Sequence, residues 1–334
     1  MHPSYRPSRR RLIKSMLASG IAAPALLRGT GALAAYPDRP VRVIVANTPG
    51  GPSDITARIL TAALSEQTGK TFVVENKGGG GGNIGMGYVA HAEPDGYTLI
   101  LATNSLSVNV ALYHQIPYDP LKDFVAVSEV AGSPNTFAVK ADLGANTMKD
   151  FIAMAKKAPE KFNVATPPIG TAPQMQAEVL KIREGLQKMA TVVFKGGGDA
   201  LAAMLAGTAQ LSSGALGPVH PHIKSGAVKC LAVTGDTRWG DLPDVPTMLD
   251  LGYKDFVFST DTVLLAPAGT PPDVVSWLEK ETLAVLRKPD VNERLLKGGF
   301  AVRIKGGKDA SARIAKEIKQ YTDVIAQAGI QKIN

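Results

Sequence analysis

The apolar run Val41-Arg42-Val43-Ile44-Val45-Ala46 and the loop Asn47-Thr48-Pro49-Gly50-Gly51-Pro52 that follows it decide the fold of this 334-residue chain. The run has the length and the β-branched content of a buried strand. After the loop, apolar residues recur at helical spacing over residues 55–64, which predicts a helix. Ser53 or Asp54 can cap the N-terminus of this helix. A strand, a glycine-containing turn and a helix in this order predict the start of a βαβ unit.

The same alternation of short apolar runs and longer helical patterns continues along the chain. Further strands are expected at residues 71–76, 97–102, 137–139, 162–165, 191–194, 209–212, 228–233 and 263–266, and an amphipathic helix is expected at residues 310–328. This rhythm predicts an α/β protein with parallel sheets covered by helices. No long linker divides the chain, which favours two lobes joined by crossing strands over two separate domains.

The first 34 residues have the pattern of an export signal. A basic head at residues 8–14, Ser-Arg-Arg-Arg-Leu-Ile-Lys, precedes an apolar stretch at residues 16–27 and the small-residue site Ala32-Leu33-Ala34. The stretch is shorter than the roughly 20 apolar residues of a spanning helix. The basic head resembles a twin-arginine signal, and an ordinary signal is the alternative. We therefore expect a signal peptide cleaved after Ala34 and a periplasmic protein beyond it.

The positive charge of the chain lies mostly in this leader. Residues 1–34 hold six Lys or Arg and no Asp or Glu, so without them the formal net charge falls from +8 to +2. The remainder has no basic surplus of the kind that marks a nucleic-acid-binding surface. The single cysteine, Cys230, cannot form a disulfide within the chain, and the apolar run at residues 228–233 predicts that it is a buried strand residue.

Glycine-rich turns between strand and helix patterns carry most of the information about function. They lie at residues 50–51, 78–82, 170 and 196–198. Such turns let backbone N–H groups approach a ligand closely, and the helix N-terminus that follows favours negative charge. Hydroxyl and amide side chains near these turns can hold a carboxylate directly or through water. They are Thr48, Ser53, Thr103, Asn104, Ser105, Thr166, Thr171, Gln174, Ser212 and Ser213. The alternative that these residues only form turns and helix caps stays open.

Other kinds of site find weaker support. Residues 80–85 satisfy the G-x-G-x-x-G pattern after a strand. A dinucleotide site also requires an acidic residue at the end of the next strand, and this sequence has none there. His220 and His222 lack the spacing of a metal site, and no G-x-S-x-G nucleophile motif occurs. Asp261, between two threonines, can face a cleft or cap a turn. We expect no cofactor, no metal and no catalytic residue.

Short segments in a fixed order also match a known family. They lie at residues 36–45, 49–58, 73–77, 81–85, 94–99, 195–198, 221–226, 231–234, 242–247 and 265–271. Together they resemble the Bug-type solute receptors of tripartite tricarboxylate transporters, the periplasmic substrate-binding component of those systems. Each segment is weak alone, but the ordered set covers essentially the whole chain after the leader.

The resemblance implies a two-lobed periplasmic binding protein, or Venus flytrap, with a ligand cleft between two α/β domains. Domain 1 would comprise residues 35–135 and 258–334, and domain 2 residues 136–257. Members of the family clasp a carboxylate between loops of both lobes, partly through water. By position, these loops carry over as Thr48, Pro49, Gly50, Gly51, Ser53, Asp54, Thr103, Asn104 and Ser105 in the first lobe, and as Gly170, Thr171, Ala172, Gln174, Lys195, Gly196 and Gly197 in the second. Ser213 and Asp261 complete the candidate set.

The expected function is that of a non-enzymatic receptor, a monomer, that delivers a small organic carboxylate to the membrane permease of a tripartite tricarboxylate-type transporter. Gln174 stands where members often have a histidine, and residues 211–218 lack an acidic residue that members often have. Both departures fall at the expected cleft, so the identity of the ligand stays open. The alternatives are an exported nucleotide-dependent α/β enzyme that uses residues 80–85, and a solute receptor that feeds a sensor protein.

Overall fold

Strand β4 (Phe124–Lys140) pairs with β7, β8, β9 and β10 and thereby joins the two halves of one ten-stranded sheet. The computed structural model describes residues 36–327 and 329–334, so the signal peptide expected at residues 1–34 lies outside the described residues. The strand order is β2-β1-β3-β9-β4-β7-β5-β6, and β8 and β10 pair with β4 outside this order.

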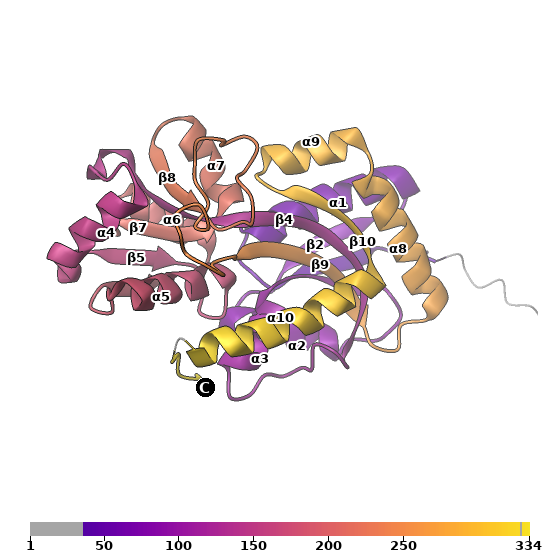
Figure 1. Cartoon of the computed structure of the whole chain (residues 1–334). Coiled ribbons are helices and arrows are strands. Elements are labelled where there is room, and N and C mark those ends of the chain that lie inside the picture. The colour runs from indigo at the N-terminus through magenta and orange to yellow at the C-terminus, as the bar shows by residue number, and fades with distance from the viewer. Residues whose placement is uncertain (1–35, 328) are drawn as a thin grey trace, which may run out of the picture. The chain divides into compact units, whose positions relative to one another are not determined.

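One half of the sheet contains the beginning of β4 and strands from both ends of the chain. These strands are β1 (Val41–Val45), β2 (Phe72–Asn76), β3 (Thr98–Thr103), β9 (Ser259–Pro267) and β10 (Ala301–Gly306). Their helices are α1 (Pro52–Thr68), α2 (Asn83–Ala90), α3 (Ser105–Leu112), α8 (Pro272–Leu286), α9 (Pro289–Lys297) and α10 (Gly307–Gln327). Helix α1 packs with α8 and α9, whereas α10 packs with α3 (Figure 1).

The other half contains the end of β4 and the middle of the chain. Its strands are β5 (Asn163–Thr166), β6 (Ala190–Val193), β7 (Leu211–Ala215) and β8 (Val228–Val233). Its helices are α4 (Met148–Lys157), α5 (Ala172–Glu184), α6 (Gly197–Leu205) and α7 (Leu216–Lys224). Short 3-10 turns occur at Gly80–Gly82, Ala141–Leu143 and Pro159–Lys161. In Figure 1 the elements from α4 to β8 form a separate group beside those of the first half.

The expectation of parallel sheets is correct only in part. Strand β1 pairs in parallel with β2 and β3, and β5 pairs in parallel with β6 and β7. Every pairing of β4 is antiparallel, as is that of β3 with β9. The cause is that the chain crosses between the halves along β4 and returns along β9, and these two strands run beside each other in opposite directions.

Two large buried apolar clusters hold the elements of the sheet together. In the first half, Ile44 and Ile100 on neighbouring strands are fully buried together with Leu265 of β9. The other cluster contains the fully buried Phe137 and Phe151 together with Leu112 of α3 and Tyr321 of α10, so it packs elements of both halves against each other. These clusters fix the strands, so the loops that leave the strands hold defined positions.

Seven strands are followed directly by a helix along the chain. Two of them, β9 and β10, lead into α8 and α10, and the other five are β1 into α1, β3 into α3, β5 into α5, β6 into α6 and β7 into α7. In open α/β sheets, ligands bind in the crevice outside the carboxyl ends of the strands. The connections contain the glycine turns at residues 50–51, 170 and 196–198. The fold therefore brings most of the expected loops to one region.

Candidate ligand-binding pocket

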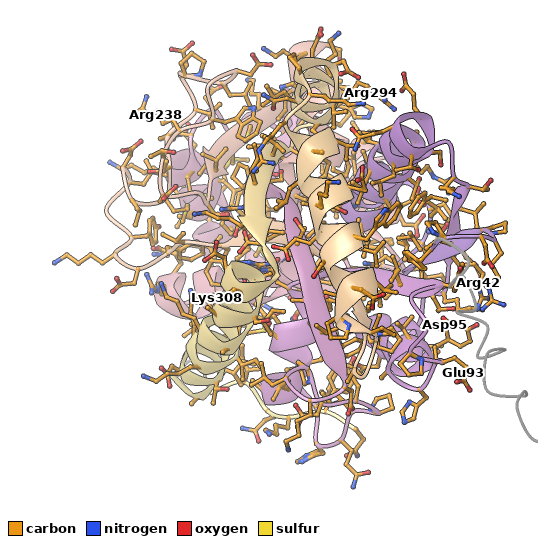
Figure 2. The ribbon with its side chains drawn as sticks, turned by 90° about the vertical axis from the view of Figure 1, so that its right-hand side faces the viewer. Arg42, Glu93, Asp95, Arg238, Arg294 and Lys308 are labelled. Atoms are coloured by element: carbon orange, nitrogen blue, oxygen red, sulfur yellow. The ribbon has the colours of Figure 1, made fainter. Side chains whose placement is uncertain are left out.

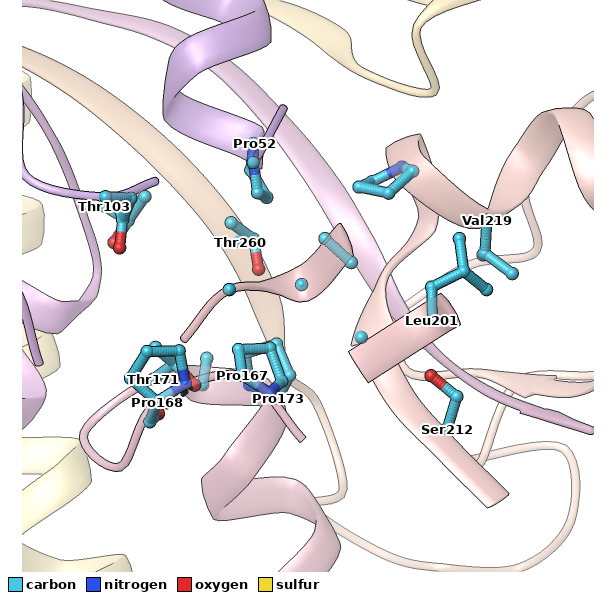
Figure 3. Close-up of a pocket in the computed structure, with 18 of the residues that line it drawn as sticks. Pro52, Thr103, Pro167, Pro168, Thr171, Pro173, Leu201, Ser212, Val219 and Thr260 are labelled. Atoms are coloured by element: carbon cyan, nitrogen blue, oxygen red, sulfur yellow. Dashed lines mark hydrogen bonds between the residues drawn. The ribbon is translucent and has the colours of Figure 1, made fainter. Parts of the chain in front are cut away.

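A pocket lies where these five strand-to-helix connections meet (Figure 3). It contains about 700 Å³ of space free of protein atoms, part of it open to solvent. The lining residues are Asn47, Thr48, Gly51, Pro52, Thr103, Asn104, Thr136 and Thr260, together with Pro167, Pro168, Thr171, Ala172, Pro173, Gly196, Gly197, Leu201, Ser212, Gly214, Ala215, Pro218 and Val219.

Five helix N-termini point their capping residues at this pocket. The residue before each helix is a lining residue: Gly51 for α1, Asn104 for α3, Thr171 for α5, Gly196 for α6 and Ala215 for α7. The first N–H groups of a helix have no partner within the helix and carry partial positive charge. Only the Thr171 side chain, among these five caps, accepts a hydrogen bond from its own helix. The pocket is therefore complementary to an anion.

No charged side chain is among the lining residues of this pocket in the described part of the chain. Charged side chains such as Arg238, Arg294 and Glu93 lie at the exposed periphery instead (Figure 2). Backbone dipoles thus supply the positive potential, and they act more strongly where water is excluded.

Four hydroxyl groups of the pocket are already used as donors within the protein. Thr103 Oγ1 donates to Ser105 Oγ at 3.2 Å, and Thr136 Oγ1 donates to Gly214 O at 3.1 Å. Thr171 Oγ1 donates to Pro168 O at 2.8 Å, and Thr260 Oγ1 donates to Asn135 Oδ1 at 2.6 Å. The hydroxyls of Thr48 and Ser212 have no hydrogen-bond partner within the described residues. Backbone N–H groups and these two hydroxyls are consequently the available donors for a ligand.

Ser53 and Asp54 lie behind the first loop and hold its shape. Ser53 Oγ accepts from Asn47 Nδ2 at 3.0 Å, and Asp54 accepts from Gly50 N at 3.0 Å and from Arg58 Nε at 2.9 Å. Burial opposes ionisation, but the Arg58, Gly50 and Asn76 donors prevail, so the pKa of Asp54 lies below its ordinary value. Neither residue caps α1, contrary to expectation, because the helix already begins at Pro52, and proline suits the first helical position.

The side chain of Asn104 ties the pocket to the C-terminal helix. Its Nδ2 donates to Glu317 Oε1 at 2.8 Å, and its Oδ1 accepts from Asp261 N at 2.7 Å. Glu317 in turn is 2.5 Å from Arg313, which also lies 2.9 Å from Glu129. Burial raises the pKa of Glu317, and the Arg313 charge opposes this rise. No local sequence pattern reveals Glu317, because it lies more than 200 residues from Asn104.

Side chains alternate between the two faces of strands β7 and β9, and this alternation points two of the predicted residues away from the pocket. Thr260 lines the pocket, whereas its neighbour Asp261 is 2.7 Å from Arg303. Ser212 lines it, whereas the Ser213 hydroxyl donates to the Pro173 carbonyl at 2.6 Å. Successive strand residues point to opposite faces, so only one of each pair can reach the ligand space.

The structure therefore brings part of the predicted set together. The predicted residues that line the pocket are Thr48, Gly51, Thr103, Asn104, Thr171, Ala172, Gly196 and Gly197. Pro49 and Lys195 line an adjoining outer pocket together with residues 78–82. The predicted residues outside both linings are Gly50, Ser53, Asp54, Ser105, Gly170, Gln174, Ser213 and Asp261. Gln174 borders a different groove, beside Glu178 and Ile330.

Sequence reasoning missed the apolar part of the lining. Those residues are Pro52, Pro167, Pro168, Pro173, Leu201, Ala215, Pro218 and Val219. It also left Asn47, Thr136, Gly214 and Thr260 out of the site, whereas Ser212, named among the possible carboxylate-binding hydroxyls, does line the pocket. The prolines could have been found from their place at the starts of helices, but Leu201 and Val219 come from helix faces whose direction no sequence pattern gives.

Other potential sites receive no support from the described residues. There, no group of three or more His, Cys, Asp or Glu is placed to hold a metal ion. His220 Nε2 is 3.3 Å from Asp241 Oδ2, and His222 lies in α7. Cys230 lies in β8 as predicted but is only partly buried. Over residues 36–327 and 329–334, no helix is both long and apolar enough to cross a bilayer.

Comparison with known sequences gives matches over nearly the whole chain. The profile of the tripartite tricarboxylate transporter family receptor (TctC) matches residues 56–330. Protein BugT of Bordetella pertussis is 32% identical over 313 residues, which are 93% of this chain and 94% of that protein.

Comparison with solved structures agrees. The periplasmic binding protein BugD has a TM-score of 0.86 and 34% identity, over 89% of this chain and 100% of that chain. Rpa4515 of R. palustris, solved with adipate, has a TM-score of 0.85 and 30% identity over 89% of this chain and 100% of that one. MatC of Rhodopseudomonas palustris, solved with malate, has a TM-score of 0.82 and 29% identity over 87% and 100%.

Proposed function

Because this chain belongs to the tripartite tricarboxylate transporter receptor family, we propose that it captures a small organic carboxylate in the pocket at the five helix N-termini. The family comprises periplasmic solute-binding receptors, and the chain is a receptor of this kind rather than an enzyme. Its fold is that of a two-lobed periplasmic binding protein.

The observation that carries the proposal is the convergence of helix N-termini on a pocket with no charged lining residue in the described chain. Partial positive charges fixed in the backbone stabilise an anion without being neutralised by a fixed counter-charge. The adipate and malate of two structural neighbours support a carboxylate as this anion.

We propose that the lobes are residues 35–135 with 258–334, and residues 136–257. The division of β4 between the two halves of the sheet, with its change of partners from β9 and β10 to β7 and β8, supports these limits. Closure of the lobes would bury the ligand and strengthen each hydrogen bond to it.

We further propose cleavage after Ala34 and delivery of the ligand to the permease of a tripartite tricarboxylate transporter. Mass spectrometry of the protein exported by its native host should give an N-terminus at Ala35. Chemical crosslinking in the same cells should capture the permease. Capture of a sensor kinase instead would assign the receptor to signalling.

Calorimetric titration of the mature protein with a panel of mono- and dicarboxylates tests the capture itself. A ligand present at 100 times its Kd should raise the free energy of unfolding by about 2.7 kcal/mol, because it binds only the native state. If every carboxylate in the panel leaves both heat and stability unchanged, the proposal is wrong.

Two adjacent glycines in the first turn of α6 provide a matched pair of variants. Gly197 lines the pocket, whereas a Cβ on Gly198 would meet no atom within 4 Å. Gly197→Val should weaken binding of the best carboxylate at least tenfold, because its side chain obstructs approach to the helix N-terminus. Gly198→Val should bind as the unmodified protein does. Equal binding by both variants would remove α6 from the site.

A further inference from the structure

The pocket has two chemically different ends. In Figure 3, Thr103 and Thr171 lie at one end, and Leu201 and Val219 lie at the other. The first end also receives the N-terminus of α3 at Asn104 and has Thr260 beside it. The Thr103, Thr171 and Thr260 hydroxyls already donate within the protein, so the donors at this end are backbone N–H groups at the starts of α3 and α5. Across the pocket the lining changes to hydrocarbon.

The apolar end belongs to the interior of the protein. Leu201 and Val219 are 7% and 4% exposed and are members of one buried cluster with Leu216 and Met204. Ala215 and Pro218 complete the wall. These side chains are held from behind by the core, so the end is a preformed apolar surface.

Charged groups near this end are turned away from it. His220 follows Val219 in α7, but its Nε2 is 3.3 Å from Asp241 Oδ2 and it is not a lining residue. Burial lowers the pKa of His220, although the Asp241 carboxylate opposes this shift. Figure 3 draws Ser212 on the same side of the pocket as Leu201. A single hydroxyl can bond a neutral polar group but cannot compensate a full charge.

On the premise of the proposed function, we infer that this receptor selects monocarboxylates with an apolar tail and rejects dicarboxylates of the same length. The carboxylate lies at the Thr103 and Thr171 end, and the tail lies against Leu201 and Val219. A second carboxylate placed against this apolar wall would lose its hydration and would find only the Ser212 hydroxyl and the N-terminus of α7, where Pro218 in the first turn has no N–H to donate.

Hexanoate and adipate provide the test, since the two differ only in a methyl group against a carboxylate at the far end. Calorimetric titration of the mature protein should give hexanoate at least tenfold tighter binding than adipate. From butanoate to hexanoate, affinity should rise about fourfold per added CH2, as expected for methylene burial. Adipate binding as tightly as hexanoate, or no rise with chain length, would overturn the inference while leaving carboxylate capture intact. Failure of every acid in both series would refute the proposed function and the inference together.

The introduction of a positive charge at the apolar end gives a second test. Val219→Lys places an ammonium group beside the tail and should turn the preference toward adipate. Ile223→Lys is the control, since Ile223 lies one turn further along α7, packs on the same cluster and does not line the pocket. It should keep the preference for hexanoate. If Val219→Lys does not fold, the two acid series on the unmodified protein still decide the matter.

Discussion

Replacement of Gly170 by alanine should destabilise the protein through one buried contact. Gly170 has φ +86°, a conformation that residues with a Cβ adopt at a cost of about 1–2 kcal/mol. In addition, its new Cβ would overlap Oδ1 of Asn109. Asn109 is fully buried, and its Nδ2 donates to Asn83 Oδ1 at 2.7 Å and to Gly81 O at 3.1 Å. It cannot withdraw without losing those bonds.

The magnitude follows from these two contributions. The backbone contributes about 1 kcal/mol and the two hydrogen bonds of Asn109 about 1 kcal/mol each, so Gly170→Ala should lower the free energy of unfolding by about 3 kcal/mol. Gly185→Ala is the matched control, because Gly185 has φ +69° and a Cβ there would meet no atom within 4 Å. It should lose only about 1 kcal/mol.

Urea unfolding followed by circular dichroism measures both losses on the same scale. In an Asn109→Ala background, where the obstructing oxygen is absent, Gly170→Ala should cost no more than Gly185→Ala, which gives a coupling of about 2 kcal/mol. Equal losses for the two glycine variants in the unmodified background would mean that residues 109 and 170 are not in contact in solution, and the reasoning would fail.

Three further predictions concern buried groups. Asp54→Asn should lower the free energy of unfolding by about 1 kcal/mol at pH 7, since the buried carboxylate that accepts from Gly50 N and Asn76 Nδ2 is replaced by an amide with a single acceptor oxygen. Because the pKa of Asp54 is lowered, this stabilisation is present above the unfolded value near 3.8 and is lost as the pH falls through the folded value, so urea midpoints of variant and unmodified protein should converge in acid. Cys230 as a whole is only partly buried, but burial at its thiol raises the pKa of that thiol to about 12. A disulfide reagent at pH 8 should therefore label it much more slowly in the native protein than in denaturant, and equally rapid labelling in both would contradict this. Glu317→Ala should cost about 3–5 kcal/mol in urea unfolding, because Arg313 loses a buried counter-charge, and a loss below 1 kcal/mol would show the pair to be unimportant.

Much of the fold could be predicted where the sequence pattern is strong. The apolar run at residues 41–46 predicts β1 to within one residue, and the helical spacing at residues 55–64 predicts α1, which begins at Pro52 and ends at Thr68. Strand β4 was expected only at residues 137–139, although it begins at Phe124. Glu129 and Pro134 interrupt the apolar pattern of its first part, so that part does not resemble a buried strand in the sequence. Glu129 is tolerated there because Arg313, far away in the sequence, lies 2.9 Å from it in the fold.

Strand β10 and helix α9 were missed for a related reason. Residues 301–306 are largely exposed or half-exposed on an edge, so their side chains do not form the continuous apolar run of a buried parallel strand.

The sequence predicts the backbone loops of the site but not all of the side chains that line it. Glycine turns before Pro52, Gly197 and Ala172 mark strand-to-helix connections, and such connections gather at one edge of the sheet. The choice between Ser212 and Ser213 depends on the phase of β7, which neighbours in the sheet determine. Leu201 and Val219 reach the pocket only because α6 and α7 lie side by side, a tertiary fact.

The long strand β4 has a consequence for how the protein is made. Its first half is completed by β9 and β10, at residues 259–267 and 301–306, which the ribosome adds last. Until then β3 and β4 present open edges, and open edges invite pairing with other chains. Truncated chains that end before residue 259 should therefore aggregate rather than form a smaller stable domain. The first half of the sheet can be completed only after residues 259–306 have been synthesised.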